Sequence, residues 1–513
     1  MKKYYLILAF IAYTVTSIGQ AGELDLSFNG DGKVTLDLSY DDVGTTVAIQ
    51  ADEKLVVGGV TNNTNADLVV TRLDRYGNPD LSFGNLGITE LDFSKPNSTS
   101  NELMRDVSIK ADGRIILLAE AQVQSESGLM LVRLQANGQL DYTFADSGKV
   151  FIDNWYGKNY WTSVVNLPNG KIIVAGRAYG SSTIEGVLVG FNEDGSRDYT
   201  FGDSSLVSFS LSGGSVQLNQ MLLAGNGDLL LVGSGFAQGE KNFLAARISS
   251  KGVFDATFGG NGISIFPFGG SAVANDVHLN ADGSMVLAGD VYLNGRYQVA
   301  LAKVLSDGTL DQNFGTNGKV ITPILDDDTF IEAVGVLGDG KILISGTTDG
   351  IWNEDIVLAR YRTDGSLDNS FSYDGIATKN LVNGYDRAFD ALVQPNGRMV
   401  IVGYSFENGS NSSVITVSRF LGGQGTVGEE EWDDLNKLVI FPNPASSQIS
   451  IDLANSEEVY KLELINSVGG IVKKVPKYQS GTAILLDDFI SGVYILKVDD
   501  FNGQVTTRRL VIR

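Results

Sequence analysis

The chain has 513 residues, of which 61 are glycine, nine are proline and none is cysteine. Its formal net charge is −23, which argues against nucleic acid as a partner, because phosphate contacts need clustered Lys and Arg. The absence of cysteine excludes disulfides, thiolate nucleophiles and thiolate zinc sites. β-branched and aromatic residues fill the periodic stretches, so we expect many short strands joined by tight turns.

The first 19 residues have the features of a secretory signal peptide. Lys2 and Lys3 precede the apolar stretch "YLILAFIAYTV", and Ser17 and Gly19 supply small residues at the expected cleavage point. The apolar stretch is shorter than the roughly 20 residues that a transmembrane helix needs, and no other segment of the sequence qualifies. We therefore expect a signal peptide at 1–19 and a mature protein outside the cytoplasm, without a transmembrane span.

An Asp-x-x-Phe motif recurs along most of the chain at intervals of 55, 61, 57, 57, 56 and 57 residues. A Gly follows four residues after each Phe, except where Ser205 stands. A period this steady predicts a repeat architecture. The seven copies of the motif contain Asp25 and Phe28, Asp80 and Phe83, Asp141 and Phe144, Asp198 and Phe201, Asp255 and Phe258, Asp311 and Phe314, and Asp368 and Phe371.

Two further landmarks keep the same period. One is a turn dipeptide followed by an apolar run, as in "DGRIILLA" and "NGKIIVAG"; only the first copy departs, with Asp52 followed by Glu53. Asp-Gly or Asn-Gly predicts a two-residue hairpin turn in which both central residues adopt positive φ. The other landmark is a strand such as "LMLVRLQANG" that ends just before the next motif. Each unit then holds four short strands, which predicts the blade of a β-propeller.

The order of these landmarks predicts how the ring closes. The first copy begins with the motif, and the last copy ends at Leu421 without one. The strand near residues 33–38 should therefore complete the last blade beside residues 386–421, which removes the open sheet edges. Within each motif we expect the Asp to accept hydrogen bonds from the turn and the Phe to fill the gap between blades. The motif is thus interpreted as structural.

The repeats resemble the delta-60 repeat family, whose pattern is essentially "DGSLDxSFGxxG…PDGKIxVAG…LARL", over residues 24–422. The resemblance implies a secreted bacterial propeller-like array and brings no established catalytic residues. We therefore expect an all-β fold in which residues 20–424 form a seven-bladed propeller of four-stranded antiparallel blades.

The sequence after Gly425 has a different character. Residues 425–435 are acidic and are expected to form a linker. Residues 436–513 alternate in polarity around Gly-centred turns, which predicts a small Ig-like β-sandwich.

This tail resembles the type A C-terminal sorting domain of the type IX (Por) secretion system of Bacteroidetes. The resemblance rests on Pro442, Asn443 and Pro444, on "SGVYILKV" with Gly492 and Tyr494, and on the basic ending "RRLVIR". It implies recognition by the outer-membrane translocon and a final location at the cell surface or in the medium. An ordinary carbohydrate-binding or adhesive Ig-like domain is the alternative interpretation of the tail.

The sequence predicts no catalytic constellation. Its one histidine, His278, should lie on the strand nearest the central channel, where a tolerated substitution is the preferred interpretation and a catalytic histidine the alternative. No Gly-x-Ser-x-Gly elbow and no zinc-type His pair is present. Residues 326–328 read as a solvated acidic loop.

Asp106, Asp276 and Asp390 occupy one equivalent position, six residues before the hairpin turn. Carboxylates arranged around a channel could bind Ca²⁺, which prefers oxygen ligands; the alternative is that they are solvated ends of inner strands. No other cofactor is expected.

The aromatic segment "NWYGKNYW" contributes Trp155, Tyr156, Tyr160 and Trp161. Exposed rings of this kind stack on sugars or anchor protein partners, whereas packing against a neighbouring blade is the alternative.

The sequence favours a non-enzymatic binding or interaction platform with a glycan or protein ligand. A glycan-active enzyme, either a polysaccharide lyase or a hydrolase, is the competing class, and a purely structural surface-layer role is the third. An enzyme should show a dense cluster of Arg, Tyr, Asp or Glu with shifted pKa values at one channel mouth. A binding protein should show an exposed aromatic or polar patch.

Overall fold

The computed structural model describes residues 20–38, 40–62, 66–93, 100–123, 126–153, 159–180, 183–212, 214–237, 239–324, 327–349, 354–410, 412–423, 439–441, 448–452, 459–466, 471–486, 489, 492–499 and 505–512. The chain divides into two compact units, Met1–Thr426 and Val427–Arg513. The described residues form strands and turns without any helix, and so they contain no helix long and apolar enough to cross a membrane. The predicted signal peptide, the acidic linker and Pro442, Asn443 and Pro444 lie outside the described residues.

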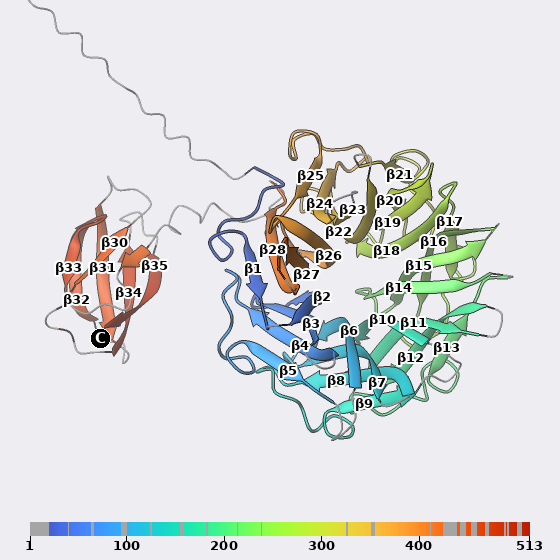
Figure 1. Ribbon diagram of the computed structural model, residues 1–513, viewed down its shortest axis with the longest axis horizontal. Coiled ribbons are helices and arrows are strands. Elements are labelled where there is room, and N and C mark those ends of the chain that lie inside the picture. The colour runs from blue at the N-terminus through green and yellow to red at the C-terminus, as the bar shows by residue number, and fades with distance from the viewer. Residues whose placement is uncertain are drawn as a thin grey trace, which may run out of the picture. The chain divides into compact units, whose positions relative to one another are not determined.

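The first unit is a seven-bladed β-propeller of four-stranded antiparallel sheets (Figure 1). Blade 1 contains β2 (Asp41–Ile49), β3 (Leu55–Asn62), β4 (Ala66–Leu73) and β5 (Ile88–Leu91), and blade 2 contains β6 (Ser100–Ile109), β7 (Ile115–Val123), β8 (Glu126–Leu134) and β9 (Lys149–Asp153). Blade 3 contains β10 (Asn159–Asn166), β11 (Ile172–Tyr179), β12 (Ile184–Phe191) and β13 (Leu206–Phe209), and blade 4 contains β14 (Val216–Leu223), β15 (Leu229–Ala237), β16 (Glu240–Ile248) and β17 (Ile263–Phe266). Blade 5 contains β18 (Ser271–Leu279), β19 (Met285–Leu293), β20 (Arg296–Val304) and β21 (Lys319–Thr322), and blade 6 contains β22 (Asp328–Val336), β23 (Ile342–Asp349), β24 (Glu354–Tyr361) and β25 (Ile376–Lys379).

Blade 7 closes the ring with a strand from the other end of the repeat array. It contains β26 (Gly384–Val393), β27 (Arg398–Glu407) and β28 (Val414–Leu421), and its outermost strand is β1 (Lys33–Leu36). β1 pairs antiparallel with β28, with Val34 opposite Val417, and Figure 1 shows the blue β1 beside the orange β28. The predicted closure is confirmed.

The first strand of each blade lies innermost and carries a β-bulge. The pairing between the first and second strands shifts by one residue in each of the blades, for example between Met104 and Asp106 in blade 2 and between Ile331 and Ala333 in blade 6. These inner strands follow one another around the ring, and β26 contacts β2 to complete it (Figure 1). A bulge frees backbone N–H groups from the ladder, so these groups need other acceptors.

The turn between the first two strands differs from the predicted two-residue hairpin. In blade 2 the N–H of Gly113 bonds to the carbonyl of Lys110, and Gly113 has φ 83° while Asp112 does not have positive φ. This is a three-residue loop, a type I turn followed by one left-handed residue. The prediction of two positive-φ residues was wrong because the same dipeptide also suits this longer loop. In blade 1 Glu53 takes the left-handed position, with φ 64°.

The Asp-x-x-Phe motif follows the third strand and is structural, as predicted. Each of the seven phenylalanines is fully buried; Phe83, for example, packs among residues of blades 1 and 2. Each aspartate accepts a hydrogen bond from the backbone N–H two residues on, as Asp141 does from Thr143 at 3.1 Å. Ser205, in the glycine position of the motif, adopts φ 75°.

The sequence analysis missed the partner of these aspartates. An Arg from the third strand pairs with the aspartate and lies over the phenylalanine ring in five of the blades. The Arg, Asp and Phe sets are Arg72, Asp80 and Phe83; Arg133, Asp141 and Phe144; Arg247, Asp255 and Phe258; Arg360, Asp368 and Phe371; and Arg419, Asp25 and Phe28.

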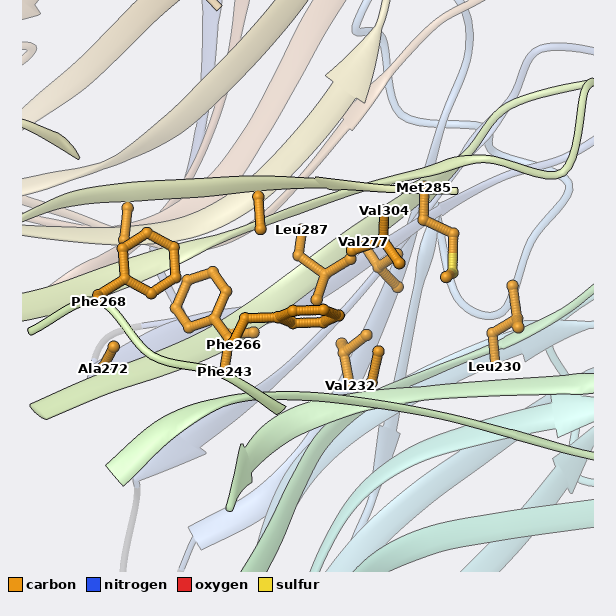
Figure 2. Close-up of a cluster of buried hydrophobic side chains, with 14 of the residues drawn as sticks. Leu230, Val232, Phe243, Phe266, Phe268, Ala272, Val277, Met285, Leu287 and Val304 are labelled. Atoms are coloured by element: carbon orange, nitrogen blue, oxygen red, sulfur yellow. The ribbon is translucent and has the colours of Figure 1, made fainter. Parts of the chain in front are cut away.

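Apolar side chains fill the space between neighbouring blades. Figure 2 shows one such cluster, in which Val232 and Phe243 of blade 4 lie against Val277 and Leu287 of blade 5. The second and third strands are buried on both faces, as their unbroken apolar runs predict. The propeller therefore has a series of cores between blades.

The second unit is a small β-sandwich. One sheet contains β29 (Val439–Phe441), β30 (Gln448–Asp452) and β33 (Ala483–Leu485), and the other contains β32 (Ile471–Gln479), β31 (Val459–Asn466), β34 (Gly492–Asp499) and β35 (Val505–Ile512). Ile451 and Leu464 belong to its core, and Tyr494 packs edge-on against Phe489 at 5.4 Å between ring centroids. Gly492 begins β34.

Candidate functional site

The antiparallel meander gives the propeller two different faces. The turns that join the first to the second strand, and the Asp-x-x-Phe turns, lie on one face, which we call the motif face. The hairpins between the second and third strands, and the connections between blades, lie on the other, which we call the hairpin face.

Asp106, Asp276 and Asp390 directly follow the bulges of their inner strands, and each reaches the next blade. Their Oδ2 atoms accept hydrogen bonds from the backbone N–H groups of Val164 at 2.7 Å, Val334 at 2.8 Å and Val47 at 2.8 Å. These bonds give acceptors to N–H groups beside the bulges. The three carboxylates therefore join neighbouring blades.

No group of three or more Asp, Glu or His side chains in the described part of the chain lies close enough to hold a metal ion. The predicted calcium set is not brought together as a chelating cluster, and calcium binding by these residues stays a prediction. Burial raises the pKa of Asp106 to about 6 and that of Asp276 to about 7. Burial, together with repulsion from Asp276 and Asp106, also raises the pKa of Asp390 well above its ordinary value.

The four residues of the predicted aromatic segment do not share one environment. Trp155 and Tyr156 lie outside the described residues. Trp161 is only 3% exposed and packs in the core between blades 2 and 3, so its ring has no free face for a ligand. Tyr160 is partly exposed and meets Tyr179 edge-on at 5.6 Å.

The charged residues beside Tyr160 are mainly basic. The guanidinium of Arg177 lies 5.0 Å from the centroid of the Tyr160 ring. Arg105 donates to Glu120 at 2.9 Å, and the other oxygen of Glu120 accepts the backbone N–H of Trp161, also at 2.9 Å. Both oxygens of the Glu120 carboxylate are therefore engaged.

His278 lies on the inner strand β18, as predicted, and is partly buried. Burial lowers the pKa of its imidazole. A neutral, partly buried imidazole is consistent with the tolerated substitution.

A second group of aromatic and charged side chains spans blades 5 to 7 on the hairpin face, and sequence reasoning did not single it out. We call it the blade 5–7 patch; its members are Tyr292, Tyr297, Phe330, Phe389 and Tyr404, with Asp290, Glu332, Glu354 and Arg387.

The aromatic part of the patch crosses from one blade to the next. Tyr292 and Tyr297 flank the hairpin between β19 and β20, with ring centroids 5.1 Å apart. Tyr297 also contacts Phe330 of blade 6 at 4.9 Å. Tyr292 is 45% exposed and Tyr297 is 37% exposed. The two aromatic rings therefore offer accessible surface on the hairpin face of the propeller.

The charged part of the patch continues from blade 6 into blade 7. Arg387 donates to Glu354 at 3.2 Å, and the hydroxyl of Tyr404 donates to the other oxygen of Glu354 at 3.3 Å. The Arg387 guanidinium lies 5.7 Å from the centroid of Phe389, which lies 6.0 Å from that of Tyr404. These contacts order the guanidinium and the two rings.

Asp290 and Glu332 differ in the hydrogen bonds that their carboxylates accept. Asp290 is 9% exposed and accepts the backbone N–H of Ile331 at 2.7 Å, as Glu120 does in blade 2. Glu332 is the bulge residue of β22, and no hydrogen bond or ion pair reaches its carboxylate from any residue that the structure describes. Within the described residues, the Glu332 carboxylate thus accepts no hydrogen bond, although the charge of Arg387 acts on it.

Burial raises the pKa of both groups. The pKa of Glu332 rises to about 7, although the charge of Arg387 opposes the rise. The pKa of Asp290 rises to about 8, and the neighbouring charge of Glu332 adds to the effect of burial.

A signal for this patch was present in the repeats. The bulge position holds Thr45, Thr162, Asn219 and Asn275 in four blades, but Arg105, Glu332 and Phe389 in the others. In the consecutive blades 6 and 7 the bulge residue is no longer small and polar, and this change indicates where the repeat has been altered.

Seven closed blades followed by a small β-sandwich define the class of the protein as a β-propeller with a C-terminal accessory domain. Two family models match the sequence and refine this assignment. A β-propeller domain of unknown function, DUF5122, matches residues 50–83, 110–144, 167–201, 281–314 and 337–371, and the secretion system C-terminal sorting domain matches residues 439–513. The chain is therefore a propeller of DUF5122 repeats, related to the delta-60 type, that carries a type IX sorting domain for export to the cell surface or the extracellular space.

No curated protein matches the sequence. Solved structures of similar fold include PorZ, a surface component of the type IX secretion system of Porphyromonas gingivalis (TM-score 0.34, 12% identity, 91% of this chain and 59% of PorZ). They also include the polysaccharide lyase Uly1 (TM-score 0.44, 11% identity, 76% of this chain and 91% of the lyase) and Drosophila Semaphorin 2a (TM-score 0.43, 8% identity, 96% and 98%). The chain spans 59% of the length of PorZ.

Proposed function

We propose that this exported propeller is a non-enzymatic binding platform for glycans and that the blade 5–7 patch is its binding surface. The observation that carries the proposal is the series of contacting rings Tyr292, Tyr297 and Phe330, which crosses a blade boundary and exposes two tyrosines. Sugar rings stack on aromatic faces, and polar groups held beside those faces fix the orientation of the sugar. Glu354, Arg387 and Tyr404 supply such groups in a hydrogen-bonded set.

A glycan-active enzyme is the second candidate, because Asp290 and Glu332 interact with each other and have raised pKa values, and the charge of Arg387 acts on Glu332. Binding is favoured over catalysis for a geometric reason. Glycoside hydrolysis uses a pair of carboxyl groups that both meet the substrate, and Asp290 is instead buried against Ile331. The hydroxyl of Tyr404 is engaged by Glu354, and burial raises its pKa, so Tyr404 is a poor base.

The test is a glycan array probed with the purified chain lacking residues 1–19, followed by product detection on every glycan that binds. Replacing Tyr292 and Tyr297 by Ala should weaken binding at least tenfold, a loss of about 1.4 kcal/mol. Tyr142→Ala is the matched control, because Tyr142 is 72% exposed and lies on the motif face. Unchanged binding in the double variant would contradict the assigned surface, and release of shortened or unsaturated products would establish the enzyme instead.

A further inference from the structure

We propose that the blade 5–7 patch selects glycans that carry positively charged amino groups. This inference rests on the proposed function and names the chemical class of its ligand. It follows from the charges that the patch leaves uncompensated beside its aromatic rings.

The acidic groups of the patch outnumber the basic ones. Once Glu332 ionises, its charge and that of Glu354 stand against Arg387, and Arg387 is already paired with Glu354 at 3.2 Å. The formal charge of the whole chain, −23, has the same sign and attracts cations toward the surface. A carboxylated or sulfated glycan would meet like charge here and find the guanidinium occupied.

Glu332 is the specific partner for a cationic group. Asp106, Asp276 and Asp390 on inner strands, and Asp290 on β19, each accept a backbone N–H from the following blade. Glu332 accepts none from the described residues, and it lies two residues from Phe330 on β22. A partly buried carboxylate without a partner is unfavourable when ionised, and an ammonium group held beside it would remove that penalty.

The aromatic rings of the patch also attract cations. The face of a tyrosine or phenylalanine ring carries negative potential and attracts cations within about 6 Å of its centroid. Tyr297 and Phe330 contact each other at 4.9 Å, and Phe330 stands two residues before Glu332 on β22. An amino sugar stacked on these rings would present its ammonium group to ring faces and carboxylate together, whereas an N-acetylated sugar would gain only the stacking.

The aromatic group of blades 2 and 3 has the opposite charge balance. Arg177 lies beside Tyr160, and Glu120 is engaged by Arg105 and by the backbone N–H of Trp161. The chain therefore contains an internal comparison: one aromatic group with excess acid and one with excess base. Only the first should respond to an amine on the ligand.

The experiment compares a chitosan hexamer with the fully N-acetylated hexamer, which has the same backbone without the charged amines. Isothermal titration of the chain lacking residues 1–19 at pH 7, where a carboxyl with a pKa of about 7 is half ionised and part of the hexamer's amines keep their charge, should give at least tenfold tighter binding of the chitosan hexamer. Glu332→Gln should reduce this preference to threefold or less and leave the affinity for the N-acetylated hexamer unchanged. The matched controls are Glu90→Gln, an exposed acid on the outer strand of blade 1, and Tyr179→Ala in blade 3; both should keep the full preference.

A permanently charged hexamer, the N,N,N-trimethyl derivative, tests the role of ionisation. Glu332 is influenced by Arg387 on β26 and by Asp290 on β19. Because the pKa of Glu332 is about 7, affinity for the trimethyl hexamer should rise between pH 5.5 and pH 8.5. The rise should be clearly smaller in Glu332→Gln, where Asp290 still titrates.

Each outcome separates the two proposals. Equal affinity for the two hexamers, or tighter binding of an oligouronate, would leave glycan binding intact and overturn the selectivity for amines. Binding of oligolysine without any glycan binding would overturn both proposals, as would the absence of binding to every probe.

Discussion

The Nε of Arg133 donates a hydrogen bond to Oδ2 of Asp141 at 2.7 Å, and both side chains are almost fully buried. The same guanidinium donates from Nη1 to the carbonyl of Glu193 in the next blade at 2.7 Å and lies 4.6 Å from the centroid of Phe144. One side chain therefore fixes the turn, covers the buried ring and joins two blades. The repeated motif is thus a device for joining blades.

Replacing Arg133 by Ala should destabilise the propeller by about 3–5 kcal/mol, because the buried carboxylate of Asp141 would lose its close partner and keep the more distant Arg114, at 4.0 Å. Urea unfolding followed by tryptophan fluorescence measures the loss. Arg133→Ala combined with Asp141→Asn should recover part of it, since the orphaned charge is then gone. Arg362→Ala is the control: its side chain is 52% exposed and lies 3.9 Å from Asp368, so its loss should be within about 1 kcal/mol. An equal loss in both single variants would contradict this account.

Glu53→Gly should stabilise the propeller by about 0.5–1 kcal/mol. Glu53 stands at φ 64° where Gly113 of blade 2 has φ 83°, and the left-handed conformation is costly for residues with a Cβ atom. The salt bridge lost with Glu53 is an exposed contact to Arg75 at 3.6 Å and contributes little. Thermal unfolding should show a higher midpoint for Glu53→Gly and a lower one for Gly113→Ala. A lower midpoint for Glu53→Gly would show that the turn is not strained.

The fold could be predicted because the features that determine it recur in successive repeats of the sequence. The seven buried phenylalanines and the glycine-like φ of Ser205 repeat one local geometry, and the missing motif in the last copy indicates closure by the first strand. The Arg partner was also visible, since Arg72, Arg133, Arg247 and Arg360 each stand eight residues before the motif aspartate. It was missed because a lone basic residue on a strand carries no turn or packing signal.

The blade 5–7 patch could not be derived in the same way. Its contacts join β19, β22 and β26, whose side chains meet only when three blades are placed side by side. Phe330 and Arg387 occupy ordinary strand positions in their own repeats. Periodicity describes what the blades share, whereas a binding surface depends on where they differ.

Deleting residues 436–513 should abolish export of the propeller across the outer membrane, because the sorting domain lies in that segment. The measurement is immunodetection of the propeller on intact cells and in the medium, against its amount inside the cell. A variant with Tyr142→Ala and an intact tail should be exported normally. Surface display of the tail-less chain at the level of the full chain would contradict the role of the tail.

Asp276→Asn should change how the stability of the propeller depends on pH. Burial raises the pKa of Asp276 from 3.8 to about 7, so the folded state holds this proton more tightly than the unfolded state does. The stabilisation is therefore complete below about pH 4 and is lost as the pH rises to about 7. The asparagine side chain of the variant cannot ionise, and its amide offers one acceptor where the carboxylate offers two.

The variant should be less stable than the parent chain at pH 5, and the difference should shrink or reverse at pH 8. Melting temperatures measured in buffers between pH 5 and pH 8 test this crossing. Val165→Ala, which alters an inner strand without changing a titratable group, should shift the whole curve by a constant amount. Parallel curves for the parent chain and Asp276→Asn would show that the carboxyl is not buried as described.

Removing residues 20–38 should open the ring between blades 7 and 1. The deletion takes away β1, leaves Arg419 without Asp25 and empties the site of Phe28, whose ring is fully buried between those blades. Loss of the ring alone costs about 1.5–3 kcal/mol, and β28 would present an unpaired edge that favours self-association. Unfolding should therefore begin at a lower temperature, and light scattering should report oligomers. A synthetic peptide of residues 20–38 should restore the melting temperature, whereas the same peptide with Phe28→Ala should not; an unchanged melting temperature in the truncated chain would mean that the first strand does not close the propeller.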